Sequence, residues 1–278
     1  TAPAPATPAF GVTTSRGTNV RSRPSSGSRR VARLKQGTRV RVTCQRMAQI
    51  APGRSGRSRI WDRVVLPGGK RAWVADGLLN TGSELLVAKI CGDPGYTAAE
   101  SGATSGRCPV GTPVKLLEPF ENAEELIDAA LPGARASQKR YRVPVAMTLA
   151  QTILETGAGK IAAGANNYFG IKARATGARG VYAWGENASG CVLKKTREAE
   201  PDGRLVITIG AFRAYTSLEN SILDHGDLLT SNPVYRGAFR YTGDARRFAR
   251  EIARFYATDP KYALKLLELM KRYKLEQR

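Results

Sequence analysis

Apolar and polar positions follow two different patterns along the chain. In the first part, short runs rich in β-branched residues alternate with turn segments that contain Gly, Pro and Lys. The runs occupy residues 31–34, 39–44, 61–66 and 71–76. Glycine in the intervening segments supplies the positive φ angles that tight turns need. Short strands at this spacing predict a small β-barrel domain over residues 17–83.

The pattern changes after a Gly-rich connector over residues 84–115. Apolar residues then recur at helical spacing in 119–134 and 143–159, and the second helix is apolar on nearly all sides, which predicts that it is buried. Further helices are predicted over 217–230, 244–256 and 259–275, with β-type runs within 178–214. We therefore expect a mainly helical α+β domain over residues 116–278, with a β insertion and a cleft.

The first 16 residues are rich in Ala and Pro, which predicts an extended linker over 1–16. The chain contains no apolar stretch of about 18 residues, so we expect no membrane span. It also has no signal peptide. We therefore expect an exported protein to be a processed form that begins at the sequence TAPAPATPAF.

Charge is unevenly distributed between the two predicted domains. The chain carries a formal net charge of +21, and residues 1–83 contribute 16 Lys and Arg residues against only Asp62 and Asp76. The N-terminal domain therefore offers a binding surface for a polyanion, either nucleic acid or the anionic polymers of a bacterial wall. A basic surface kept for solubility is the alternative. No nucleic-acid recognition motif accompanies the charge, which disfavours nucleic acid.

Histidine and cysteine content limits the chemistry. His225 is the only histidine, which excludes a zinc site with two or three imidazoles, and we expect it to serve helix packing or a surface hydrogen bond. Four cysteines without a C-x-x-C pair predict two disulfides in an exported protein. Three pairings are possible. We favour Cys44 with Cys91 and Cys108 with Cys191, since each bridge then stays within one proposed domain. We expect no metal and no cofactor.

Glu155 is the residue with the clearest chemical signal. It lies at the C-terminal end of the predicted buried helix, where desolvation and the negative end of the helix dipole both disfavour an ionised carboxylate. A carboxylic acid that keeps its proton near neutral pH can protonate a leaving glycosidic oxygen. The alternative is a glutamate that caps or hydrogen-bonds the following loop.

The N-terminal domain resembles a bacterial SH3 domain. The resemblance rests on T-N-V-R-S-R-P at 18–24, L-K-Q-G-T at 34–38, Trp61 before a strand, and R-A-W-V at 71–74. It implies a wall-targeting or spacer module. For Trp61 and Trp73 we expect core packing rather than ligand stacking.

Five ordered blocks follow in the C-terminal domain: L-A-Q-T-I-L-E-T-G at 149–157, N-Y-F-G-I-K at 167–172, F-R-A-Y at 212–215, N-P-V-Y at 232–235 and Y-A-T-D-P-K-Y-A at 256–263. Together they resemble family 73 glycoside hydrolases, which are peptidoglycan N-acetylglucosaminidases related to the flagellar rod-cap enzyme and to autolysins. The resemblance implies a lysozyme-like fold with Glu155 as general acid.

The family also has a T-x-E pattern that carries a second carboxylate. Thr196-Arg197-Glu198 fits it best, which implies that Glu198 activates water or stabilises oxocarbenium charge, with Glu200 and Asp202 as competitors. We expect Glu155 and Glu198 to be widely separated. This separation would favour direct attack by water, or assistance by the 2-acetamido group of the substrate.

Other residues of the blocks receive expected roles. Tyr256 matches a cleft tyrosine that orients substrate or water. Asn167 and Phe169 could line sugar subsites, although Phe169 suits the core equally well. Trp184 could stack on a sugar or be structural. Asp259 is expected to cap the last helix.

We therefore expect an exported, wall-associated monomer that binds peptidoglycan glycan strands and anionic wall polymers, and hydrolyses the glycan as an endo-β-N-acetylglucosaminidase. A muramidase or lytic transglycosylase on the same polymer, and a degenerate wall-binding protein, are the alternatives. We also expect a chain without residues 1–83 to keep its activity on short soluble glycans.

Overall fold

A computed structural model describes residues 8–54, 56–92, 102–159 and 164–278. The chain folds into two compact units. The first, called the N-terminal unit below, comprises Thr1–Ala98, Arg107–Gly111 and Val192–Ala211. The second, the helical unit, comprises Ala99–Gly106, Thr112–Cys191 and Phe212–Arg278.

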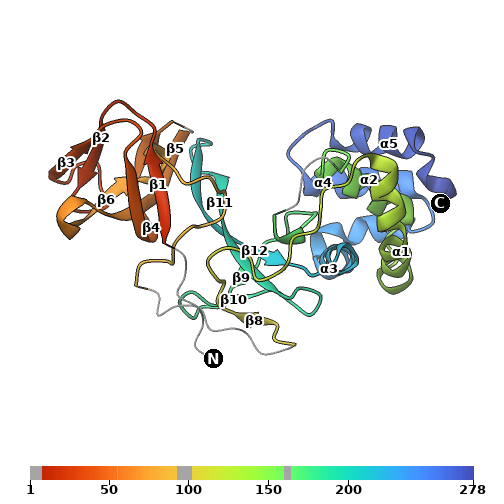
Figure 1. Cartoon of the computed structure of the whole chain (residues 1–278). Helices are drawn as coiled ribbons and strands as arrows, with labels where there is room; N and C mark the ends of the chain where they lie inside the picture. The colour runs from red at the N-terminus through yellow and green to blue at the C-terminus, as the bar shows by residue number, and fades with distance from the viewer. Residues whose placement is uncertain (1–7, 55, 93–101, 160–163) are drawn as a thin grey trace. The chain divides into compact units, whose positions relative to one another are not determined.

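An antiparallel sheet forms the body of the N-terminal unit (Figure 1). Its strands are β1 (Ala9–Thr13), β2 (Thr18–Arg21), β3 (Arg30–Leu34), β4 (Arg39–Gly53), β5 (Gly56–Val65), β6 (Arg71–Ala75) and β7 (Leu79–Asn80), in the order β3-β2-β6-β5-β4-β1-β7. Valines at alternate positions, among them Val40, Val42 and Val64, fill its core. The predicted SH3-like strands are confirmed, and Trp61 is buried as expected.

Strand β1 corrects the prediction of a linker over residues 1–16. Residues 9–13 pair with β4 in register Ala9 to Val42, and with β7. Phe10 lies on the outer face beneath the guanidinium of Arg39, 3.9 Å from its ring centroid. The run A-F-G-V-T contains an aromatic and two β-branched residues, which suit an added strand better than the Ala/Pro composition upstream suggested.

The β insertion forms a hairpin of β11 (Gly190–Ala199) and β12 (Leu205–Ala214). Strand β12 pairs in parallel with β5 at Ile207 and Ser58, so the hairpin belongs to the same sheet as the SH3-like strands. On its other side, the amide of Lys195 donates to the carbonyl of Glu84 at 2.8 Å. Residues 192–211, which we assigned by sequence to the C-terminal domain, thus fold with the N-terminal unit.

Five helices make up most of the helical unit (Figure 1). They are α1 (Ala123–Tyr141), α2 (Val145–Glu155), α3 (Leu218–Ser231), α4 (Ala245–Tyr256) and α5 (Tyr262–Arg272), close to the predicted ranges. A turn of 3-10 helix at Pro233–Tyr241 and a small sheet of β8 (Ser105–Gly106), β9 (Arg174–Ala175) and β10 (Tyr182–Ala183) complete the unit. Helix α2 packs against α1, α4 and α5, and all its residues from Ala146 to Ile153 are buried.

The cysteines are oxidised. Cys44 and Cys91 form a disulfide with a Cα to Cα distance of 5.0 Å, which is the predicted pairing. Cys108 and Cys191 are also disulfide-bonded. In the described part of the chain, no helix combines the length and the apolar character that crossing a membrane requires.

Candidate active site

Glu155 is the last residue of α2, and the chain turns sharply after it. Gly157 and Gly159 both adopt positive φ angles, of 58° and 82°, which glycine tolerates without strain. The hydroxyl of Thr156 donates to the carbonyl of Thr152 at 2.7 Å and accepts from the amide of Gly159 at 3.0 Å. Thr156 therefore makes the loop contacts that our alternative interpretation gave to Glu155.

The carboxyl group of Glu155 is held by a phenol from another helix. Tyr262, at the start of α5, donates its hydroxyl proton to Glu155 Oε1 at 2.7 Å. The amide of Gln151 in turn donates to the Tyr262 oxygen at 3.0 Å. Gln151 and Glu155 are one turn apart on α2, so both reach the same phenol. Glu155 is thereby oriented by a chain of two hydrogen bonds from buried residues.

Two opposing influences act on the pKa of Glu155. Loss of water around the carboxyl group raises the pKa above its ordinary value, while the hydrogen bond from Tyr262 stabilises the carboxylate and lowers it. Desolvation is the larger effect, and the pKa is raised. Glu155, at the end of the helix, nevertheless remains exposed to solvent. A proton donor that faces solvent on one side is accessible to a substrate.

Tyr256, the last residue of α4, lies next to this pair. Its ring stacks on Tyr262 with centroids 5.6 Å apart and meets the ring of Tyr235 at 6.3 Å. Burial and the nearby charge of Glu155 raise the pKa of Tyr256 well above its usual value, so its hydroxyl keeps its proton. The structure thus brings Tyr256 close to Glu155 and leaves it able to donate a hydrogen bond.

His225 lies behind these tyrosines and is fully buried. Its ring stacks on Phe169 at 4.0 Å and meets the ring of Tyr256 edge-on at 5.9 Å. Burial lowers the pKa of His225 to about 3, so the imidazole is neutral. The expectation of helix packing is confirmed. Phe169 is a core residue, which is one of the two roles considered for it.

Asn167 is also buried, and its side chain ties the loop that carries the N-Y-F-G-I-K block. Its amide donates to the carbonyls of Ile171 and Arg213 at 2.8 and 3.0 Å, and its oxygen accepts from the amide of Ile171 at 2.9 Å. This use of the side chain differs from the sugar contact expected of Asn167.

The predicted second carboxylate belongs to the N-terminal unit. Glu198, on β11, accepts a hydrogen bond from the hydroxyl of Thr196 at 3.3 Å. Glu200 binds the guanidinium of Arg59 through two contacts of 2.6 and 3.2 Å, and Asp202 binds Arg204. Because Glu155 belongs to the other unit, its separation from Glu198 stays a prediction.

Comparison with known proteins identifies the family of the C-terminal part of the chain. Residues 131–275, more than half of the chain, match the glucosaminidase family, described as mannosyl-glycoprotein endo-beta-N-acetylglucosaminidase. The chain belongs to the glucosaminidase family. Residues 16–80 match the bacterial SH3 domain.

The similar proteins include bacterial wall enzymes. The peptidoglycan hydrolase FlgJ of Pseudomonas aeruginosa is 35% identical over 165 residues, which cover 57% of this chain and 38% of the relative. The exo-glucosaminidase LytG of Bacillus subtilis is 28% identical over 170 residues, 59% of this chain and 56% of the relative. The matches thus span less than two thirds of these relatives.

Among solved structures, the catalytic domain of the autolysin Auto from Listeria monocytogenes is similar to this chain. Its sequence is 26% identical, its TM-score is 0.47, and the match covers 58% of this chain and 90% of that domain.

Trp184 of the glucosaminidase domain is not available for stacking on a sugar. Its side chain is 1% exposed, and its indole N–H donates to the carbonyl of Ala103 at 2.8 Å. Of the two roles considered for Trp184, the structure supports the structural one, because the side chain is buried and its N–H binds a segment far away in sequence. A single aromatic in a short β run is more often buried than exposed.

Sequence reasoning missed a buried ionic cluster in the glucosaminidase domain. Arg213 donates to both carboxylate oxygens of Asp224 at 2.7 and 2.8 Å, and the hydroxyl of Tyr215 donates to the same group at 2.5 Å. Two residues of the F-R-A-Y block thereby fasten the end of β12 to α3. The sequence gives little signal for it, because α3 also carries Glu219 and Asp227, and only the structure shows that Asp224 is the buried one.

Proposed function

We propose that this protein hydrolyses the glycan strands of peptidoglycan as an endo-β-N-acetylglucosaminidase. The observation that carries the proposal is the carboxyl group of Glu155, which has a raised pKa, is oriented by Tyr262 and faces solvent. Membership of the glucosaminidase family supports the type of bond, and relatives named as peptidoglycan hydrolases support the polymer.

Protonated Glu155 donates its proton to the glycosidic oxygen as the bond to the sugar breaks. As the carboxylate forms, the hydrogen bond from Tyr262 strengthens, because its acceptor becomes charged. Tyr256 keeps its own proton and donates a hydrogen bond to the substrate or to the attacking water. The three side chains thus divide proton donation, stabilisation of the product carboxylate and orientation.

We assign to Glu198 the role of stabilising the oxocarbenium charge on the sugar or of activating water. Its place in the Thr196-Arg197-Glu198 run, which fits the T-x-E pattern, supports the choice. Proton NMR of the first anomer formed separates the routes. Inversion indicates water activated by Glu198, retention without a trapped adduct indicates the acetamido group, and a covalent adduct on Glu198 contradicts both.

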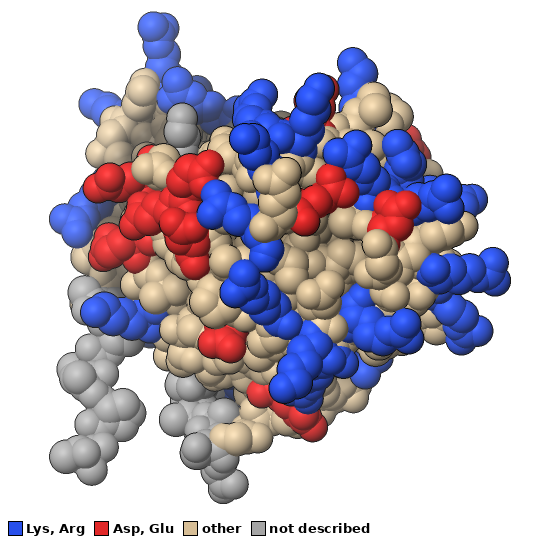
Figure 2. Space-filling model, turned by 90° about the vertical axis from the view of Figure 1, so that its right-hand side faces the viewer, with Lys and Arg blue, Asp and Glu red and all other residues tan. Residues whose placement is uncertain are grey.

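Action outside the cytoplasm and wall association form part of the proposal. The disulfide between Cys44 and Cys91 suits an oxidising compartment, and the basic SH3-like module suits an anionic wall. Figure 2 shows Lys and Arg spread over one face of the molecule, with smaller groups of acidic residues between them.

Mass spectrometry of digested peptidoglycan tests the proposal. We expect new N-acetylglucosamine reducing ends from the wild type, whereas new muramic or anhydromuramic ends would indicate the alternative cleavage. Long first products indicate internal cleavage, while release of single units would make the protein an exo-enzyme like its Bacillus relative. No turnover by the wild type would indicate a wall-binding protein.

Glu155→Gln is the decisive variant, because an amide cannot donate the proton. We expect it to fold and bind walls but to lose roughly 10² to 10⁴ in rate. The control is Glu268→Gln, at an exposed position of α5, which we expect to match the wild type. An active Glu155→Gln would contradict the assignment.

A further inference from the structure

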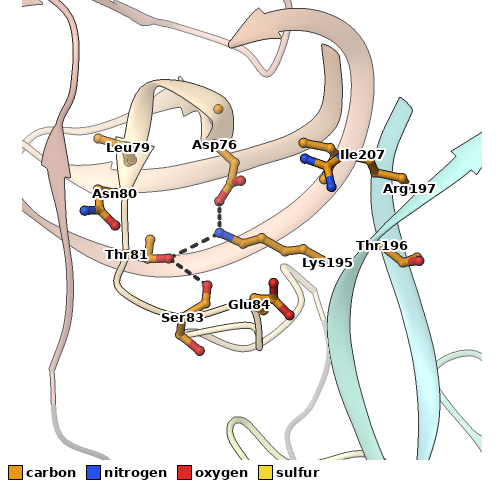
Figure 3. Close-up of a pocket in the computed structure, with 11 residues that line it drawn as sticks. Asp76, Leu79, Asn80, Thr81, Ser83, Glu84, Lys195, Thr196, Arg197 and Ile207 are labelled. Atoms are coloured by element: carbon orange, nitrogen blue, oxygen red, sulfur yellow. Dashed lines mark hydrogen bonds and ion pairs between the residues drawn. The ribbon is translucent and has the colours of Figure 1, made fainter. Parts of the chain in front are cut away.

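The two acidic residues of the basic SH3-like module (residues 17–83) are both buried, and Lys195 of the β hairpin pairs with one of them. Asp62 is 0% exposed and Asp76 is 4% exposed. Lys195 of β11 extends to Asp76, with its ammonium nitrogen 2.8 Å from a carboxylate oxygen, and also donates to the hydroxyl of Thr81 at 3.2 Å (Figure 3). The only acidic side chains of residues 1–83 are therefore buried rather than spread over the basic surface.

The two carboxyl groups of this cluster have different hydrogen-bond and ion-pair partners. The amide of Gln45 donates to Asp62 at 2.7 Å, while burial and the neighbouring Asp76 raise the pKa of Asp62 well above its ordinary value. Of the two carboxyl groups, that of Asp76 binds the ammonium group of Lys195. Both members of that pair are shielded from water, so removal of either leaves an uncompensated buried charge.

A second ion pair fastens the other side of the same hairpin. Arg59 of β5 binds Glu200 through both carboxylate oxygens. Backbone pairing joins Ile207 to Ser58 near this point. Lys195 and Glu200 thus attach the hairpin to the module on either side of Glu198 in the sequence.

The side chains of Lys195 and Glu198 lie on opposite faces of β11. Successive side chains of a strand point to opposite faces, so Thr196 and Glu198 share the face opposite to that of Lys195. The hydrogen bond from Thr196 to Glu198 agrees with this alternation. Lys195 therefore attaches the strand on the face opposite to that of Glu198.

We propose that the SH3-like module is a positioning element of the catalytic machinery, in which Asp76, acting through Lys195, fixes the strand that carries Glu198. This inference rests on the proposed function and adds a role to wall targeting. It reverses our expectation for a chain without residues 1–83, because such a chain would lose Asp76 and Arg59 and with them the support of Glu198.

The test uses the full-length protein and a short soluble peptidoglycan glycan, so that wall binding does not contribute. We expect Lys195→Met and Asp76→Leu to lower kcat at least tenfold with KM changed less than threefold. The double variant should be no slower than the slower single variant, because both remove one interaction. The limb of the pH profile set by Glu155 should stay in place, and pelleting with walls at low salt should match the wild type.

The matched control is the neighbouring pair of Lys194 and Glu84, which is also formed by β11 but is largely exposed at Glu84. We expect Lys194→Met to change kcat less than twofold. Hydrogen exchange of the intact protein supplies a readout of the strand itself. Amides of residues 193–199 should exchange faster in Lys195→Met than in Lys194→Met.

Two further variants keep the inference testable if the variants of the buried pair, Lys195 and Asp76, fail to fold. Arg59→Gln alters a half-exposed pair and should lower kcat two- to fivefold, while Lys195→Arg keeps the charge and should restore most of the rate lost in Lys195→Met. Folded variants with wild-type kcat would overturn the inference while the proposed function stands. An inactive wild type would instead overturn the proposed function.

Discussion

At the scale of single residues, the site combines the carboxyl group of Glu155, whose pKa is raised by burial, with the hydroxyl of Tyr262, whose hydrogen bond lowers that pKa. Glu155 and Tyr256 could be predicted because each belongs to a recognisable block of sequence. Tyr262 belongs to the same block as Tyr256, but its bond to Glu155 depends on how α5 packs against α2. The burial of Trp184 could not be predicted for a similar reason, since its partner Ala103 is distant in sequence.

Tyr262→Phe tests the hydrogen bond to Glu155. The phenol stabilises the carboxylate, so its removal should raise the pKa of Glu155 further, by about one unit for a bond to a charged group. Because the protonated form donates the proton, the alkaline limb of the kcat/KM profile should move to higher pH by the same amount. Tyr273→Phe, a substitution elsewhere on the same domain, is the control. An unshifted limb in Tyr262→Phe would show that Glu155 does not set it.

His225 predicts a pH dependence of stability. Its pKa is about 3 in the folded chain and about 6.5 when unfolded, so between these values the unfolded state binds the extra proton. Stability is then greatest above pH 6.5 and falls as the pH decreases, by about 2 kcal/mol between pH 6.5 and 4.5. Urea unfolding at the two pH values measures the change. His225→Phe keeps a ring on Phe169 and should lose that part of the dependence. If the free energy of unfolding depended on pH equally in the wild type and in His225→Phe, a buried neutral imidazole would be contradicted.

At the scale of elements, helices were predicted well and the β insertion less well. The helices have one apolar face, or are apolar all round like α2, and their periodicity is visible in the sequence. Strand β11 reads C-V-L-K-K-T-R-E-A, so its second half looks like a polar loop. It pairs with β12 and with the backbone of residues 84–86, and nothing in the sequence of β11 itself indicates either partner.

The crossing of α1 and α3 depends on a glycine. A Cβ at Gly226 would contact the hydroxyl of Ser137 and lie 2.7 Å from a ring carbon of Tyr141. Gly226→Ala should therefore force the helices apart and lower the free energy of unfolding by about 1 to 3 kcal/mol. Thermal unfolding measures the loss. Gly243→Ala is the matched control, since nothing lies within 4 Å of its Cβ. Equal melting temperatures for both variants would contradict the close approach.

At the scale of the whole molecule, net charge and its position have separate consequences. A charge of +21 attracts any polyanion, wherever the basic residues lie. The excess of Lys and Arg in residues 1–83 predicts something more specific. It predicts that the module supplies most of the attraction to the wall. The two buried acids strengthen that bias, because neither contributes negative charge to the surface.

Neutralising equal numbers of basic residues in the two units separates these claims. One variant changes Arg29, Arg30 and Lys35 to Gln in the module, and the other changes Lys139, Arg236 and Lys271 to Gln in the helical unit, all at exposed positions. Both carry Glu155→Gln, so that walls stay intact while binding is measured by pelleting.

Screening shortens the reach of surface charges from about 30 Å at 0.01 M salt to about 3 Å at 1 M, so binding of the unmodified surface should fall steeply with salt. At low salt we expect the module variant to bind about threefold or more weakly, and its salt dependence to be shallower, because fewer charges remain to be screened. The helical-unit variant should stay close to the parent. Equal weakening of both would mean that net charge alone holds the protein to the wall, and the module would keep only its role in supporting the hairpin.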